Sequence, residues 1–196
     1  MATLKIFSWT CALIAAMSLS LSQARADLIV NGGFETGDFT GWTTGPNTFP
    51  QFIVGSPVHS GHFAAQIAGF SNRPDTLSQA VTTSPGQSYD LSFWRFVDGG
   101  GPTILLTGSW DGQQIFSEFN TGSQPYQQFS FNVVGTGSDT LLFTSANDPS
   151  FTYLDDVSLT PSTITPEPSS MALLGGCMIC LAIRAIRRRR HLSTAV

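Results

Sequence analysis

Few side chains in this chain of 196 residues have the types and spacing that catalysis needs. His59, Ser60 and His62 lie close together, and a histidine beside a hydroxyl group could activate a nucleophile, but no acid in a recognisable motif accompanies them. The chain has neither the Gly-x-Ser-x-Gly turn of serine hydrolases nor the His-Glu-x-x-His helix of zinc proteases. We therefore expect a protein without catalytic activity.

Two further patterns could indicate catalysis or metal binding. Thirteen acids leave a glycan-active enzyme as the lesser alternative, which would need two carboxylates across a cleft on a larger scaffold. Cys177 and Cys180 have the spacing of a redox or metal pair, but they lie inside an apolar run, where we expect them to fill space. Because the third cysteine, Cys11, is near the N-terminus, the long middle region has no disulfide and relies on its core or on a bound metal.

The N-terminal segment, residues 1–26, is predicted to be a signal peptide. Lys5 precedes an apolar stretch that runs to about Leu21, and Ala24 and Ala26 form the small-x-small pattern that signal peptidase accepts. The mature chain would then begin near Asp27. The alternative is an uncleaved membrane anchor, but the stretch is interrupted by polar residues and is short for a spanning helix.

Residues 171–186 form a second apolar segment, which is followed by the cluster Arg187, Arg188, Arg189 and Arg190. As a helix this segment would be about 24 Å long, against a hydrocarbon core of about 30 Å, so it is a marginal transmembrane helix. Arginines that follow an apolar run stay in the cytoplasm, which predicts a basic cytoplasmic tail at 187–196 and an exported region before the span.

Pro166, Glu167 and Pro168 stand directly before that span, in a linker at 162–170, and the prolines favour extended backbone there. The order of Pro-Glu-Pro, short apolar segment and arginine cluster resembles the PEP-CTERM sorting signal of Gram-negative bacteria. The resemblance implies passage through the inner membrane, cleavage by an exosortase, and a protein that is then released or re-anchored at the cell surface. Arg184 inside the span and the six residues after Arg190 depart from the usual pattern.

The exported region is strongly acidic. Of the nine lysines and arginines, two lie in the signal peptide and five lie at Arg184 and Arg187–Arg190, which leaves Arg73 and Arg95. All thirteen acids lie between Asp27 and Glu167, so the formal charge of this region is 2 − 13 = −11. Such a charge excludes nucleic acid as a partner held by charge attraction and favours divalent cations.

Residues 27–161 are predicted to be an all-β domain. Short apolar stretches recur between clusters of Gly, Pro, Asn and Asp, and Ser84-Pro85-Gly86-Gln87 and Asp111-Gly112 have the composition of turns. The expected strands are residues 63–67, 77–82, 89–97, 104–110, 115–119, 129–134, 140–144 and 153–160. This pattern favours a two-sheet jelly-roll sandwich, with a barrel as the lesser option.

Alternation within the strands predicts which side chains form the core. The core set comprises Tyr89, Leu91, Phe93, Val97, Phe129, Phe131, Val133, Leu141 and Phe143. Trp94 and Phe96 fall on the opposite face. Asp155 shares its parity with Val157 and Leu159, so we expect it to point inward, where a carboxylate needs a cation or several donors.

Three stretches carry a second resemblance: "NGGFETGDFTGW" at 31–42, "HSGHFAAQI" at 59–67 and "YLDDVSLTP" at 153–161. Together they resemble the jelly-roll, galactose-binding-like domains found among carbohydrate-binding modules. The resemblance implies a structural calcium ion held by Glu35 and Asp155, with a carbonyl oxygen of Gly61 or His62. Asp156 takes the place of Asp155 if the strand register differs. Calcium takes six to eight oxygen ligands of these kinds.

Sugar binding in such modules uses aromatic faces and polar groups. The candidates are Trp94, Trp110 and Arg95, with Trp42 and Tyr126 behind them, although an aromatic ring is more often a core residue than a ligand contact. Two hypotheses therefore stand. The first is a component of an extracellular polysaccharide matrix or biofilm whose domain is mainly structural, and the second is a lectin-like sugar binder. The second requires Trp94 and Trp110 to be exposed on one face.

Overall fold

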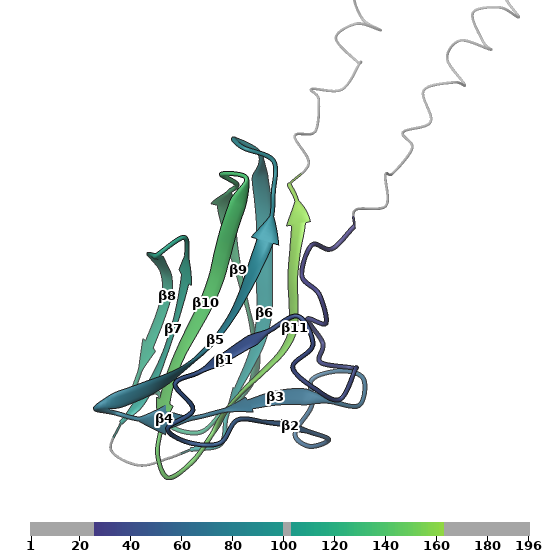
Figure 1. Ribbon diagram of the computed structural model, residues 1–196. Helices are drawn as coiled ribbons and strands as arrows, with labels where there is room; N and C mark the ends of the chain where they lie inside the picture. The colour runs from purple at the N-terminus through teal and green to yellow at the C-terminus, as the bar shows by residue number, and fades with distance from the viewer. Residues whose placement is uncertain (1–25, 100–102, 163–196) are drawn as a thin grey trace, which may run out of the picture. The chain divides into compact units, whose positions relative to one another are not determined.

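Figure 1 shows the computed structural model of the protein, which describes residues 26–99 and 103–162. These residues form eleven strands, and no helix among them is long and apolar enough to cross a membrane. The predicted signal peptide up to residue 25, the Pro-Glu-Pro motif, the span at 171–186 and the arginine cluster lie outside the described residues.

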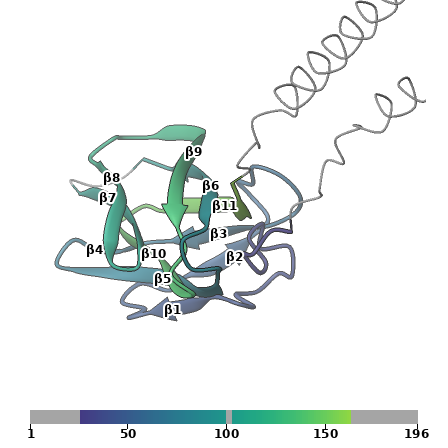
Figure 2. The ribbon, with the colours of Figure 1, turned by 90° about the horizontal axis from the view of Figure 1, so that it is seen from above.

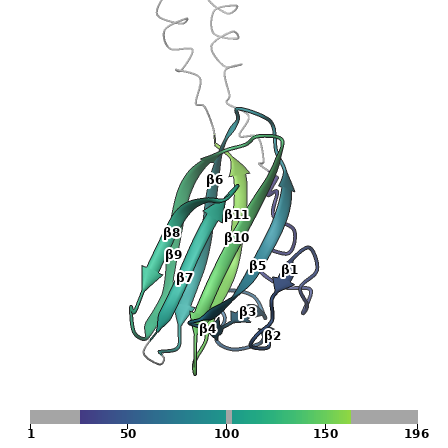
Figure 3. The ribbon, with the colours of Figure 1, turned by 60° about the vertical axis from the view of Figure 1, so that its left-hand side comes forward.

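The strands build two antiparallel sheets, which Figure 2 shows from above and Figure 3 from one side. The first, which we call sheet A, contains in order β1 (Thr43–Gly45), β5 (Arg73–Thr82), β10 (Ser138–Asn147), β7 (Ile104–Trp110) and β8 (Gln113–Phe119), and β4 (Gly69–Phe70) pairs with the start of β5. The second, sheet B, contains in order β2 (Phe52–Val54), β3 (Ala64–Ile67), β11 (Thr152–Pro161), β6 (Ser88–Val97) and β9 (Gln124–Val134). The fold class is the predicted all-β sandwich.

All eight predicted strands are present, and both predicted turns form. Asp111 and Gly112 join β7 to β8 with φ values of 49° and 77°, as a two-residue hairpin turn requires. Between β5 and β6 the amide of Gln87 donates to the carbonyl of Ser84, with Gly86 at φ 78°. Strands β1, β2 and β4 are two or three residues long and were not predicted, because so short a segment has no readable alternation.

The core lies between the sheets, where the alternation placed it. Tyr89, Leu91, Phe93 and Val97 are all buried, and Phe93 packs edge-on against Phe143 of the opposite sheet with ring centroids 4.9 Å apart. Aromatic rings thus join the two layers directly.

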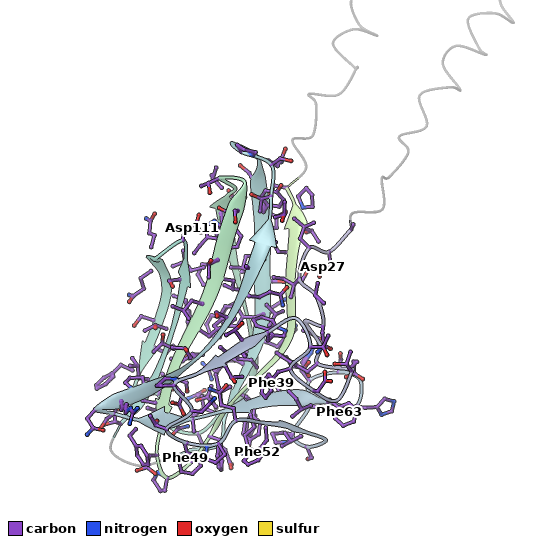
Figure 4. All side chains as sticks on the ribbon, in the orientation of Figure 1. Asp27, Phe39, Phe49, Phe52, Phe63 and Asp111 are labelled. Atoms are coloured by element: carbon purple, nitrogen blue, oxygen red, sulfur yellow. The ribbon has the colours of Figure 1, made fainter. Side chains whose placement is uncertain are left out.

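The first described residues pair with the last strand. The amide of Leu28 donates to the carbonyl of Leu159 at 2.9 Å, and Oδ1 of Asp27, whose side chain is labelled in Figure 4, accepts from the amides of Ile29 and Leu159. Residues 27–28 therefore run beside the end of β11, and the two ends of the described chain are held together.

Candidate functional site

The opening segment places Glu35 through two buried aromatic side chains. Phe34 and Trp42 are 0% and 7% exposed, their rings lie 5.5 Å apart, and the Trp42 indole donates to the carbonyl of Asn31. Because Phe34 is held in the core, the side chain of Glu35 points outward. Both carboxylate oxygens of Glu35 accept from the amide of His62, and Oε1 also accepts from the amide of Phe63.

A β-bulge in β11 corrects the predicted direction of Asp155. Asp155 pairs with Trp94 of β6, but the register shifts between Asp155 and Ser158, and Asp156 has a φ of 47°. Because the bulge inserts one residue, Asp155 faces the outer side of sheet B with Trp94, while Val157 faces the core. The side chain is nevertheless 0% exposed, because the loop that contains His59 covers it.

The loop before β3 supplies hydrogen-bond donors to both aspartates. Oδ2 of Asp155 accepts from the amides of His59 at 2.8 Å and Ser60 at 3.2 Å. For Asp156, Oδ2 lies 2.6 Å from Nδ1 of His59, and Oδ1 accepts from the hydroxyl of Ser60. Burial raises the pKa of Asp155, and the neighbouring charge of Asp156 acts in the same direction, while the amides act against it.

The side chains of Glu35, Asp155 and Asp156 all lie near Gly33. A Cβ atom at Gly33 would lie 3.4 Å from Oδ1 of Asp156, 3.9 Å from Oδ1 of Asp155 and 3.7 Å from Cγ of Glu35. Carboxylate oxygens are ligands that calcium prefers, which is the chemistry that the family resemblance implies for these side chains.

At His62 the backbone group that faces Glu35 is the amide and not the expected carbonyl. His62 presents its amide to Glu35, and its carbonyl lies 3.5 Å from where a Cβ of Gly55 would be; at Gly61 a Cβ would lie 2.2 Å from Oε1 of Glu35. Within the described residues, no three His, Cys, Asp or Glu side chains are arranged to hold a metal ion. Calcium binding at Glu35, Asp155 and Asp156 stays a prediction.

The same loop covers Trp94. The imidazole of His59 stacks on the indole with ring centroids 3.6 Å apart, and Tyr126 of β9 meets His59 edge-on at 5.5 Å. The Tyr126 hydroxyl donates to the carbonyl of Pro57, and burial raises the pKa of Tyr126. Trp94 remains partly exposed, but one face of its ring already has a partner.

The other two predicted sugar-binding residues are core residues. Trp110 is 6% exposed and lies on sheet A, where its indole donates to the carbonyl of Val134. Arg95 is 0% exposed, contacts Glu118 of β8 and Gln127, and lies over the ring of Phe129. Trp94 and Trp110 therefore do not share an exposed face, as the lectin hypothesis required. The parity of Arg95 with Phe93 and Val97 could have shown that it points inward.

Comparison with known proteins decides the family. Residues 26–143 match a carbohydrate-binding domain family, and residues 165–189 match the PEP-CTERM protein-sorting motif. The chain belongs to the carbohydrate-binding domain family. It also carries the sorting signal that the sequence predicted.

Known relatives support the fold of the carbohydrate-binding domain. The chain is 32% identical over 117 residues to Exochitinase 1 of Streptomyces olivaceoviridis, a match that covers 55% of this chain and 19% of that enzyme. TmCBM61, solved in complex with β-1,4-galactotriose, superposes with a TM-score of 0.54 at 22% identity, covering 70% of this chain and 99% of the module. The xylan-binding CBM22-1 of Paenibacillus barcinonensis Xyn10C does so with a TM-score of 0.57 at 17% identity, covering 71% and 97%.

The outer face of sheet A is a feature of this carbohydrate-binding domain that sequence reasoning missed. On β5, β10, β7 and β8, the outward positions described carry no charged side chain, because the charged residues of these strands have the other parity. Neighbouring rows are instead rich in hydroxyl groups: Thr76, Thr144, Thr107 and Ser117 form one row, and Ser78, Leu142, Ser109 and Gln114 form the next. The strand register, which the sequence does not reveal, brings them together.

Proposed function

We propose that this protein is exported, processed by an exosortase, and displayed at the cell surface or in an extracellular matrix associated with exopolysaccharide. In this role its domain is a non-catalytic module. The observation that carries the proposal is the pairing of a PEP-CTERM sorting motif at residues 165–189 with a carbohydrate-binding domain at 26–143 in one chain. The sorting motif directs the protein to the cell envelope, and the domain family indicates a carbohydrate ligand.

The charge distribution supports a neutral polysaccharide. Twelve acids and two arginines lie in the described residues, so acidic glycans would be repelled by most of the domain. The outer face of sheet A is uncharged, and its threonine and serine hydroxyl groups can both donate to and accept from sugar hydroxyl groups. We propose this face as the surface that contacts the matrix.

A lectin-like binder that uses aromatic stacking is the second candidate. Trp94 and Tyr126 are partly exposed on sheet B and favour it, since such rings stack on sugars. The packed positions of Trp110 and Arg95 speak for the structural module instead. TmCBM61 was solved with β-1,4-galactotriose and CBM22-1 is a xylan-binding domain, so galactan and xylan are the first glycans to test.

The intact mass of the mature protein, measured separately in cell-associated and medium fractions of the host, tests the sorting. A C-terminus near Pro166–Pro168 supports exosortase processing, whereas a chain that keeps Arg187–Arg190 rules it out. Sedimentation of the purified domain with galactan, xylan, chitin and the host's own polysaccharide tests the ligand. Binding only to the host polysaccharide favours the matrix role, and release of soluble sugar from any of them would overturn the non-catalytic assignment.

A further inference from the structure

Polar side chains gather between the two sheets at the end of the sandwich where β6 ends and β7 begins, the lower end in Figure 1. Ser145 and Asn147 point inward from β10 and are 1% and 0% exposed, and Arg95 points inward from β6 and is 0% exposed. Glu118 of β8 contacts Arg95 and lies in one row with Ser145, because both pair with Leu106. We call Arg95, Glu118, Ser145 and Asn147 the polar cluster.

Most of the unpartnered buried atoms of the domain belong to this cluster. Five of its side-chain atoms are buried without a hydrogen-bond partner: Arg95 Nε and Nη1, Glu118 Oε2, Ser145 Oγ and Asn147 Oδ1. Among the described residues only Gln51 and Thr121 have another such atom. Native proteins nearly always pair buried polar groups, with protein or with bound molecules, because an unmet group is costly. Five unmet groups at one place therefore indicate a binding site.

The chemistry of these atoms restricts what can bind. The two nitrogens of Arg95 only donate, whereas Glu118 Oε2 and Asn147 Oδ1 accept, and Ser145 can do either. An inorganic anion without a proton could not donate to Glu118, and a metal ion would face the N–H groups of Arg95. The charges of Arg95 and Glu118 offset each other, so the occupant is neutral. Hydroxyl groups, which both donate and accept, satisfy all of these conditions.

We propose that the polar cluster is an internal binding site for neutral hydroxyl groups, supplied either by bound water or by a sugar. Buried waters typically make about three hydrogen bonds to groups of this kind. The sugar source rests on the proposed function, but the site does not, because the cluster lies between the sheets and not on the outer faces to which glycan contact is assigned.

The Ser145→Ala variant tests the site by the sign of its effect on Tm. If Ser145 bonds to an occupant, the variant loses a hydrogen bond and Tm falls by about 3 °C. If the cluster is dry, the variant removes an unmet hydroxyl group and Tm stays or rises, which would overturn the proposal. Ser78→Ala on the outer face of sheet A is the matched control and should change Tm by less than about 1 °C.

A second measurement separates the two sources. Saturating xylose, galactose or glycerol is added to the wild type and to Ser145→Ala, and Tm is compared. A rise in the wild type that shrinks in the variant identifies the sugar or polyol as the occupant. No rise in either, together with the lowered Tm of Ser145→Ala, identifies water. A crystal structure at high resolution completes the test: density bonded to Arg95 and Glu118 supports the site, and side chains that bond directly to one another would overturn it.

Discussion

The imidazole of His59 lies flat on the indole of Trp94, with ring centroids 3.6 Å apart and planes 14° apart. A sugar ring that stacks on a tryptophan takes the same position. The loop between β2 and β3 thus occupies one face of the aromatic residue that the sequence marks as the best sugar-binding candidate, and it is fixed there by Asp156 through Nδ1 of His59.

Removal of this ring should uncover Trp94. In His59→Ala the indole loses its stacking partner, so its fluorescence should become more readily quenched by acrylamide, and the domain should lose about 1 kcal/mol of stability. His62→Ala, an exposed neighbour in the same loop, is the control. Retention of neutral polysaccharide in affinity electrophoresis should increase in His59→Ala if Trp94 binds sugar, and unchanged retention would count against the lectin-like candidate.

Calcium should stabilise the domain if Glu35, Asp155 and Asp156 bind it. The wild type in calcium at about 100 times Kd should gain about 2.7 kcal/mol over the protein in chelator, and Glu35→Gln should lose most of this gain. Asp98→Asn changes the same charge at an exposed position far along the chain and should keep it. Equal melting curves of the wild type with and without calcium would show that the amides of His59, Ser60, His62 and Phe63 suffice as partners.

Acid should weaken the domain through Asp139. Burial raises the pKa of this carboxylate, but hydrogen bonds from Thr83, Asp111 and Thr136 outweigh burial and lower the pKa to about 2. A group with a lowered pKa contributes stability above its unfolded value, near 3.8, and this contribution disappears as the pH falls toward 2. Urea unfolding between pH 5 and pH 2 should show a smaller loss of stability in Asp139→Asn than in the wild type.

Asp111 should act in the opposite direction. Its hydrogen bond with Asp139 raises its pKa, so its contribution is present below about pH 3.8 and is lost as the pH rises through the raised value. Asp111→Asn should therefore steepen the loss of stability on acidification. A flatter profile in Asp111→Asn than in the wild type would contradict this assignment.

A single substitution in the contact of Arg95 with Glu118 should destabilise the domain more than replacement of both residues. Glu118→Ala leaves the fully buried guanidinium without its charged partner and should cost about 3 to 5 kcal/mol in urea unfolding. The double variant Arg95→Met with Glu118→Leu removes both charges and should recover most of that loss. A double variant as unstable as the single one would show that shape, and not charge, governs this position.

The sequence predicted much of the fold because alternation is a local signal. Parity alone placed Tyr89, Leu91 and Phe93 in the core, and turn composition placed the hairpin at Asp111-Gly112. Strand β9 begins at Gln124, five residues earlier than predicted, because Pro125 reads as a break and yet is tolerated on an edge strand.

The candidate site could be predicted less well because it depends on relations across the chain. The bulge at Asp156 reverses the direction of Asp155, and nothing in "YLDDVSLTP" specifies it. Trp110 and Trp94 lie in different sheets, which only the strand order reveals. The orientation of the peptide planes between His59 and His62, which decides whether amides or carbonyls face Glu35 and Asp155, has no sequence signal.

The position of β11 has a mechanical consequence. This strand lies between β3 and β6, and it ends at Pro161, so whatever holds the chain beyond that residue pulls on an interior strand. β3 pairs with β11 only at Thr152–Leu154, so the neighbours near Pro161 are β6 and residues 27–28. A load along the strand axis shears the hydrogen bonds to these neighbours together, whereas a load across an edge strand could break them one at a time.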